Sequence, residues 1–243
     1  MHLDPGPGAL VYSLGLGLDQ TKLGAVLISH CHLDHYGDAE VMIEAMTRGG
    51  TKKGGVLIAP RSVLFGSGDY EASISNYHRG IVEEIHEAEV GKVYDVRGVK
   101  VSPTKALHGD PDTVGFRFQF SRIGDVGYTS DTAYFDGISD YYKGVSLLIL
   151  CVLRPRGLPW KGHLSTDEAA TIISEVRPKV AVLTHFGMRM VYAGPSKEAN
   201  FIEEETGVKT FAAFDGMAMD VGKEINVKKQ GMSKSLDRFV ESP

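Results

Sequence analysis

The sequence predicts an α/β protein in which helices cover two packed, mixed β-sheets. Apolar runs of strand length alternate with helix-like segments, and a block of short β-runs broken by glycine lies between them. Hydrophobic residues make up 42% and charged residues 23% of the 243 residues, which is typical of globular proteins and argues against disorder. We expect a single domain over residues 1–221 and a polar, mobile C-terminal tail over 222–243.

The first third of the chain contains two apolar runs that predict buried strands, at Gly24–Ile28 and Val56–Ala59. Asp38 is placed to cap a helix over residues 39–46, where apolar residues recur at helical spacing. A segment rich in Glu and His, from about Tyr70 to Glu87, predicts a further helix.

The middle of the chain has the pattern of a β-meander. Alternation along one of its runs places Phe116, Phe118 and Phe120 on the same face, as in a half-buried strand. The predicted strands are Lys92–Val96, Val99–Val101, Val114–Phe120 and Asp125–Tyr128.

The last third returns to alternating strands and helices. Ser165 or Thr166 is placed to cap the first of these helices, and Glu168 adds negative charge to its first turn. The predicted elements are the buried strand Leu147–Leu150, the helix Asp167–Val176, the buried strand Val180–Thr184 and the helix Ser196–Glu205.

Bulk properties exclude several classes of protein. The net charge of −5 gives no global attraction to nucleic acid, so a nucleic-acid substrate would need a local basic patch. The two cysteines, Cys31 and Cys151, are too few for a disulfide framework. No apolar run approaches the roughly 20 residues of a membrane span, and the first residues do not resemble a signal peptide. We therefore expect a cytoplasmic protein with no membrane partner.

The strongest chemical signal is the run His30-Cys-His-Leu-Asp-His35, which directly follows a predicted strand. Residues two apart in an extended chain point the same way, so His30 and His32 can converge on one metal ion. Asp34 and His35 follow where the chain turns into a helix, and they can reach a second ion nearby. Three His and one Asp within six residues rarely arise from packing alone, and we interpret this run as metal-binding.

Three isolated residues at the ends of predicted strands complete the candidate ligand set: His108, Asp131 and His185. Each alone is more typical of a surface or hydrogen-bonded residue, but together with the His30–His35 run they favour a dinuclear site. Imidazole and carboxylate ligands suit two divalent ions, zinc first, with manganese or iron as alternatives.

In this order, the motifs resemble those of the metallo-β-lactamase superfamily, from about residue 4 to residue 187. The resemblance implies a four-layer αβ/βα sandwich whose first strands are short or missing here. It implies one metal on His30, His32 and His108, a second on Asp34, His35 and His185, and a bridge by Asp131. It also implies that Asp4 supports the ligands from outside the metal's immediate contacts.

A second motif, Gly162-His-Leu-Ser-Thr-Asp-Glu-Ala-Ala-Thr171, is similar to one in the tRNase Z group of phosphodiesterases. His163 lies 22 residues before His185, the spacing associated with that group, which makes it a candidate proton donor to a leaving oxygen. The alternative role for His163 is a helix-capping or surface residue. The chain also departs from the group, because it has Cys151-Val152 where the group carries a His-Glu pair.

A basic loop precedes this motif and holds the chain's only tryptophan. Such a loop can bind an anionic substrate, and its indole can stack on a base or cover the site. Solvated surface charge is the equal alternative. The candidate substrate-binding residues are Arg154, Arg156, Trp160 and Lys161.

These observations predict a hydrolase that uses a metal-bridging hydroxide. Two cations about 3.5–4 Å apart lower the pKa of bridging water toward ~7, and Asp34 can orient the nucleophile. Phosphodiesters or other small anionic substrates are the first prediction, with RNA as a further candidate. Carbonyl substrates (lactones, thioesters or β-lactams) are the second, and a catalytically silent metal- or RNA-binding module is the third.

A homodimer is compatible with the sequence, because a short N-terminus would expose a strand edge.

Overall fold

The computed structural model describes residues 1–221 and 225–229. Its backbone divides into two compact units. Unit 1 comprises Met1–Ala88, Gly216–Met219 and the described residues from Val227 onward. Unit 2 comprises Glu89–Asp215 and the described residues of Asp220–Asn226. The predicted tail, 222–243, lies outside the described residues except for one short strand.

Unit 1 contains a four-stranded sheet in the order β1-β2-β3-β4, and its three strand pairs are all parallel. Its two central strands are buried along their whole length, as expected for a parallel sheet covered on both faces. The strands are β1 (His2–Leu3), β2 (Ala25–Leu27), β3 (Val56–Ala59) and β4 (Glu84–Glu87). The predicted strands around Ala25 and Val56 are therefore confirmed, although this sheet is parallel rather than mixed.

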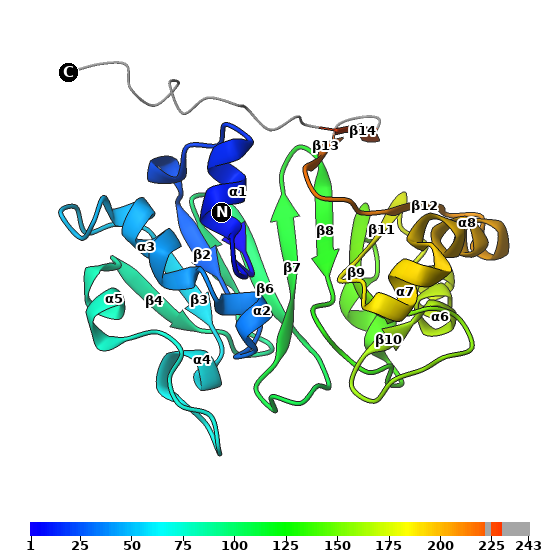
Figure 1. The fold of residues 1–243 in the computed structure, drawn as a ribbon, viewed down its shortest axis with the longest axis horizontal. Helices are drawn as coiled ribbons and strands as arrows, with labels where there is room; N and C mark the ends of the chain where they lie inside the picture. The colour runs from blue at the N-terminus through cyan, green and yellow to red at the C-terminus, as the bar shows by residue number, and fades with distance from the viewer. Residues whose placement is uncertain (222–224, 230–243) are drawn as a thin grey trace. The chain divides into compact units, whose positions relative to one another are not determined.

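Short helices surround this sheet, and α3 contacts β2 (Figure 1). Met42 and Ile43 of α3 pack into one core with Leu57 of β3. Asp38 precedes α3 as predicted, but its carboxylate accepts a hydrogen bond from the Leu10 N–H at 3.0 Å instead of capping the helix. The helices are α1 (Ala9–Gly15), α2 (Leu33–Tyr36), α3 (Ala39–Thr47), α4 (Arg61–Phe65) and α5 (Asn76–Ile81), with a 3-10 turn at Gln20–Lys22.

The long helix predicted from about Tyr70 to Glu87 is wrong. Helix α5 covers only Asn76–Ile81, Val82 is extended, and Glu84–Glu87 forms the edge strand β4. The sequence Glu-Ile-His-Glu has little intrinsic strand preference, but pairing with β3 satisfies its backbone groups. Tertiary pairing therefore overrides local propensity in this segment.

Unit 2 contains a larger mixed sheet in the order β12-β11-β9-β8-β7-β6-β5, with β10 paired to β9. Strands β5 to β8 form an antiparallel meander, whereas β9 pairs in parallel with β8 and β11. The predicted meander is thus confirmed. The strands are β5 (Tyr94–Val96), β6 (Val99–Lys105), β7 (Val114–Phe120), β8 (Gly124–Tyr128), β9 (Leu147–Arg154), β10 (Leu164–Ser165), β11 (Val180–Thr184) and β12 (Lys209–Ala212).

Three helices lie together on the β9–β12 side of unit 2 (Figure 1). They are α6 (Thr166–Val176), α7 (Met188–Ala193) and α8 (Pro195–Thr206), and a 3-10 turn covers Ile138–Tyr142. Ile172 and Ile173 of α6 pack with Leu148 and Leu183 of the sheet in one buried core. Two further strands, β13 (Met217–Val221) and β14 (Ile225–Lys229), pair with each other.

Helix α6 begins with a capping box. Ser165 is the N-cap residue, and the Glu168 carboxylate accepts hydrogen bonds from its N–H and its Oγ, both at 2.7 Å. This confirms Ser165 as one of the two predicted caps. It also removes the capping role that was the alternative for His163.

Tyr142 is the largest fully buried side chain of unit 2 and carries a buried polar contact. Its hydroxyl donates to the Tyr128 carbonyl at 3.2 Å and lies 2.7 Å from Thr104 Oγ1, so the Thr104 hydroxyl can donate in turn. Burial raises the pKa of the Tyr142 phenol well above its usual value, so the hydroxyl keeps its proton. Gly115 makes room for it, since a Cβ there would lie 2.6 Å from the hydroxyl.

No helix within residues 1–221 is long and apolar enough to cross a membrane.

We expect Tyr142→Phe to lower the free energy of unfolding by about 1–2 kcal/mol, because the buried Thr104 hydroxyl loses its acceptor. Urea denaturation followed by circular dichroism measures this. The matched control is Tyr192→Phe, because Tyr192 is 81% exposed and its hydroxyl should contribute little. Equal stability of the two variants would show that the buried contact is not stabilising.

Candidate functional site

The histidines of unit 1 are held by hydrogen bonds that begin at Asp4. The Asp4 carboxylate accepts from the Ser29 N–H at 2.7 Å, from the Ser29 hydroxyl at 2.7 Å and from His35 Nδ1 at 2.9 Å. Since the Ser29 hydroxyl gives its proton to Asp4, its oxygen accepts from His30 Nδ1 at 2.9 Å. One carboxylate therefore fixes the orientation of two imidazoles.

The ring nitrogens that face away from this network are suited to metal ligation. With Nδ1 of His30 and His35 committed as donors, Nε2 of each ring carries the lone pair that a cation needs. His30 Nε2 lies 3.1 Å from His32 Nδ1, so these two imidazoles converge as predicted. His35 Nε2 lies 3.7 Å from the Asp34 carboxylate, so the residues of the second pair also lie close together.

Local backbone geometry supports this arrangement. His32 is the extended residue before α2, and Asp34 and His35 lie within that single helical turn. Asp4 itself adopts a left-handed conformation with φ of 49°, which a non-glycine residue rarely adopts without compensating contacts. The three hydrogen bonds to its carboxylate are those contacts.

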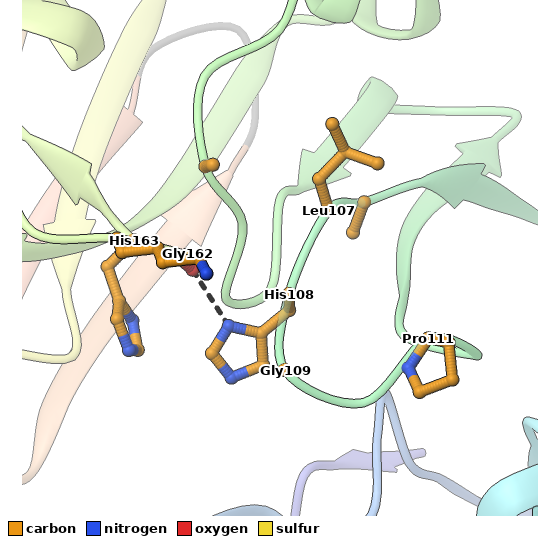
Figure 2. A pocket seen from close by; sticks show the side chains of 9 residues that line it. Leu107, His108, Gly109, Pro111, Gly162 and His163 are labelled. Atoms are coloured by element: carbon orange, nitrogen blue, oxygen red, sulfur yellow. Dashed lines mark hydrogen bonds between the residues drawn. The ribbon is translucent and has the colours of Figure 1, made fainter. Parts of the chain in front are cut away.

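In unit 2, His108 is oriented in the same way by a backbone group. Its Nδ1 lies 2.7 Å from the Gly162 carbonyl, which can only accept, so Nδ1 carries the proton and Nε2 the lone pair (Figure 2). Gly162 has φ of +78°, and a Cβ there would lie 3.3 Å from His108 Nδ1. Glycine thus permits both the backbone conformation and the close approach.

Asp131 is the carboxylate that the histidines of unit 2 surround. Its two oxygens lie 3.8 Å from His108 Nε2, 3.5 Å from His163 Nδ1 and 3.4 Å from His185 Nδ1. The residue before Asp131, Ser130, and the ligand candidate His185 both adopt left-handed backbone conformations, with φ of 56° and 60°. Such conformations cost about 1–3 kcal/mol each and are typical of functional sites.

His163 lies inside this group and not at the helix cap. Its ring centroid is 4.7 Å from that of His108 and 6.3 Å from that of His185. A backbone bridge to Trp160, with the His163 N–H donating to the Trp160 carbonyl at 3.1 Å, fixes its position. His163 is therefore held beside two of the predicted ligands.

The donor sets of the two units fit a divalent cation. In unit 2, the predicted ligands His108 and Asp131 each offer one donor atom, and His163 lies beside them, so that the three atoms fall within 4.8 Å of one another. The groups are imidazoles and carboxylates, which bind zinc, manganese and iron. The second nitrogen of His108 is occupied by an acceptor, as is usual for a metal-ligating histidine.

The basic loop divides into residues with different contacts. Arg156 donates its N–H to Glu198 at 2.9 Å, its Nε lies 3.5 Å from the same carboxylate, and its guanidinium stacks on Phe201. These contacts hold Arg156 against α8, and its substrate contact stays a prediction. The Arg154 guanidinium lies over the Trp160 ring at 4.4 Å, and its buried Nε has no hydrogen-bond partner among the described residues.

Lys161 lines a cavity together with His108 and His163, as Figure 2 shows for the two imidazoles. The apolar residues of this cavity could not be identified from the sequence, because neither Leu107 nor Ala133 is a residue type that signals chemistry. Ser29 and Gly162 were also missed, although each directly precedes a histidine that the sequence singled out. Their roles depend on hydrogen bonds that only the fold reveals.

Comparison with known proteins identifies the family. A family model described as a beta-lactamase superfamily domain matches residues 1–186. The chain belongs to the metallo-β-lactamase superfamily. It is 36% identical to an uncharacterized protein of Methanocaldococcus jannaschii over 91% of this chain and 83% of that protein.

Other members of the superfamily extend this result. A metal-dependent hydrolase of Saccharolobus solfataricus is 26% identical over 66% of this chain and 63% of its own. Ribonuclease Z of Mycobacterium marinum is 26% identical over 76% and 75%, respectively. The chain is thus a member of a superfamily of metal-dependent hydrolases.

Solved structures show the same fold. The metallo-β-lactamase fold protein YhfI of Bacillus subtilis matches with a TM-score of 0.70 and 18% identity, over 93% of this chain and 85% of that chain. A diphosphatase of the PhnP family matches with a TM-score of 0.62 and 18% identity, over 93% and 78%. The predicted α/β superfamily fold, with several sheets flanked by helices, is confirmed.

We expect Asp4→Ala to weaken zinc binding by about 10–100-fold, because His30 and His35 lose the network that orients them. Titration of metal-free protein with zinc against a competing chelator measures this affinity. Asp69→Ala, which removes an exposed carboxylate of unit 1, is the control for the change in charge. Unchanged affinity in Asp4→Ala would mean that the ligands are positioned without it.

Proposed function

We propose that this protein hydrolyses phosphodiesters with two divalent metal ions, zinc in the first instance. The proposed ligands are His30, His32, Asp34, His35, His108, Asp131 and His185. The observation that carries the substrate assignment is the position of His163, whose imidazole lies beside His108 and Asp131 in unit 2.

Bound divalent cations supply an activated water nucleophile and neutralise charge on the phosphoryl oxygens. Side chains of the protein position the water and protonate the leaving group. Asp34, whose side chain is 63% exposed, orients the attacking water through its carboxylate. His163 donates a proton to the departing alcohol oxygen, so the leaving group does not depart as an alkoxide.

Two groups of the basic loop support an anionic substrate. The Arg154 guanidinium lies over the Trp160 ring, and charge-assisted hydrogen bonds from such a group to phosphate oxygens are strong and directional. Trp160 is 55% exposed, so about half of this residue is accessible to a substrate. Arg156 is already engaged by Glu198 and anchors the loop to α8.

The names of relatives agree with this proposal without deciding it. Ribonuclease Z and a PhnP-family diphosphatase, both named among the similar proteins, act on phosphate esters or anhydrides by name. The same superfamily fold also serves other chemistry, because fold alone does not determine the substrate. The substrate must therefore be tested directly.

The deciding experiment compares bis(p-nitrophenyl) phosphate with a lactone and a β-lactam, on protein of measured metal content supplied with Zn²⁺ or Mn²⁺. We expect turnover of the phosphodiester alone, lost on adding chelator. In His163→Ala we expect two metal ions to be retained, while phosphodiester turnover falls by about 10²–10⁴-fold because the general acid is removed.

Turnover confined to a carbonyl substrate would overturn the phosphodiester assignment and leave a carboxyl-centred hydrolase. Unchanged phosphodiester turnover in His163→Ala would remove His163 from the mechanism. Failure to hold any second metal, with no turnover, would point to a catalytically silent binding module.

Arg154 and Arg156 of the basic loop provide a matched pair of substitutions. Arg154→Gln should raise KM for the phosphodiester about tenfold, because it removes a charged contact to phosphate. Arg156→Gln should leave KM unchanged and lower the free energy of unfolding by about 1 kcal/mol, because the 3% exposed Glu198 loses its charged partner and keeps only the backbone N–H of residue 156. Steady-state kinetics and urea denaturation separate the two effects. An unchanged KM in Arg154→Gln would show that Arg154 is a solvated surface residue that does not contact the substrate.

A further inference from the structure

A cavity of about 750 Å³ lies beside the His108 and His163 imidazoles in unit 2. Figure 2 shows the two rings near each other, with Leu107 and Pro111 on the loop that carries His108. Ligand-binding cavities commonly have volumes of about 300–1,000 Å³, so this one is large enough for an organic group.

The walls of this cavity are mostly apolar. Ala106, Leu107, Pro111 and Ala133 contribute hydrocarbon, and Gly109 and Gly162 contribute backbone only. Lys161 is the one Lys or Arg side chain among its described lining residues, which include no carboxylate. Such walls accept a neutral, largely apolar group and offer one cation to a neighbouring anion.

The walls are also fixed in place. The Ala133 N–H donates to the Leu107 carbonyl at 2.7 Å, and the Leu107 N–H donates to Thr132 Oγ1 at 2.9 Å. On the other side, the hydrogen bond between His108 and the Gly162 carbonyl closes the wall. A cavity held by such bonds needs little reorganisation when it binds a ligand.

The position of His163 determines which part of the substrate this cavity would receive. In the proposed function, His163 donates a proton to the oxygen of the departing alcohol. His163 forms part of the cavity wall, so an alcohol that departs beside it must extend along that wall. The other ester group of the phosphodiester then lies outside the cavity.

We propose that this cavity is the leaving-group subsite, and that it selects a compact, largely apolar alcohol such as an aryl alcohol. This inference rests on the proposed function, because it takes the role of His163 from it. An RNA strand is a poor occupant. A continuing strand needs a track of cations for its phosphates, whereas this cavity offers Lys161 alone.

The test uses two inhibitors that cannot be hydrolysed at their P–C bond. Phenylphosphonate and methylphosphonate carry the same charged group but differ in the apolar part that would enter the cavity. Each is measured as a competitor of bis(p-nitrophenyl) phosphate hydrolysis. We expect phenylphosphonate to inhibit the unmodified protein at about tenfold lower concentration than methylphosphonate.

Leu107→Glu places a carboxylate in the wall and should abolish this preference. Leu107 is 42% exposed, so the change is expected to preserve the fold. Val90→Glu is the matched control, because Val90 is 48% exposed in the same unit and does not line the cavity. It should keep the tenfold preference. Ala133→Leu narrows the cavity without adding charge, and should reduce the preference independently of how Leu107→Glu folds.

The outcomes distinguish this inference from the proposed function. If no phosphodiester is hydrolysed, the proposed function fails and the subsite falls with it. If bis(p-nitrophenyl) phosphate is hydrolysed but the two phosphonates inhibit equally, or the preference survives in both Leu107→Glu and Ala133→Leu, only the subsite is overturned. A higher kcat/KM for a single-stranded oligoribonucleotide than for bis(p-nitrophenyl) phosphate would likewise overturn the selection of a small alcohol.

Discussion

The candidate site depends on hydrogen bonds to the ring nitrogens that face away from it. An imidazole can ligate a cation only through a nitrogen that carries a lone pair, and an acceptor on the opposite nitrogen selects that tautomer. In unit 1 the acceptors are Asp4 for His35 and Ser29 for His30. In unit 2 the acceptor for His108 is the Gly162 carbonyl. Each unit therefore prepares its own donors by local contacts.

Strained backbone accompanies this requirement at three positions. Asp4, Ser130 and His185 are three of the non-glycine residues with left-handed backbone in the described chain, and all three lie in or next to the ligand groups. The strands before Ser130 and His185 are regular and buried over most of their length, and the left-handed residues lie in the turns that follow them. The strands place the backbone of each ligand residue, and the left-handed turn conformation orients its side chain.

Much of this could be predicted from sequence, because metal ligands are rare residue types in recognisable spacing. The His30–His35 run, the strand around Val56 and the meander around Val114 are evident from composition and period alone. The edge strand β4 was missed because its Glu-rich segment depends on pairing with β3 and not on its own preference. The contrast between Arg154 and Arg156 was also invisible, since Glu198 lies 42 residues beyond Arg156 in the chain.

The walls of the cavity have a consequence for how this protein can diversify. Leu107 and Ala133 are connected through main-chain groups, which every residue except proline possesses, while only their side chains define the cavity. Exchanging those side chains alters the shape of the cavity without removing the hydrogen bonds that hold the loop or orient His108. Mutational drift at these two positions can therefore explore new ligands at small cost in folding, so selectivity and metal chemistry can evolve separately.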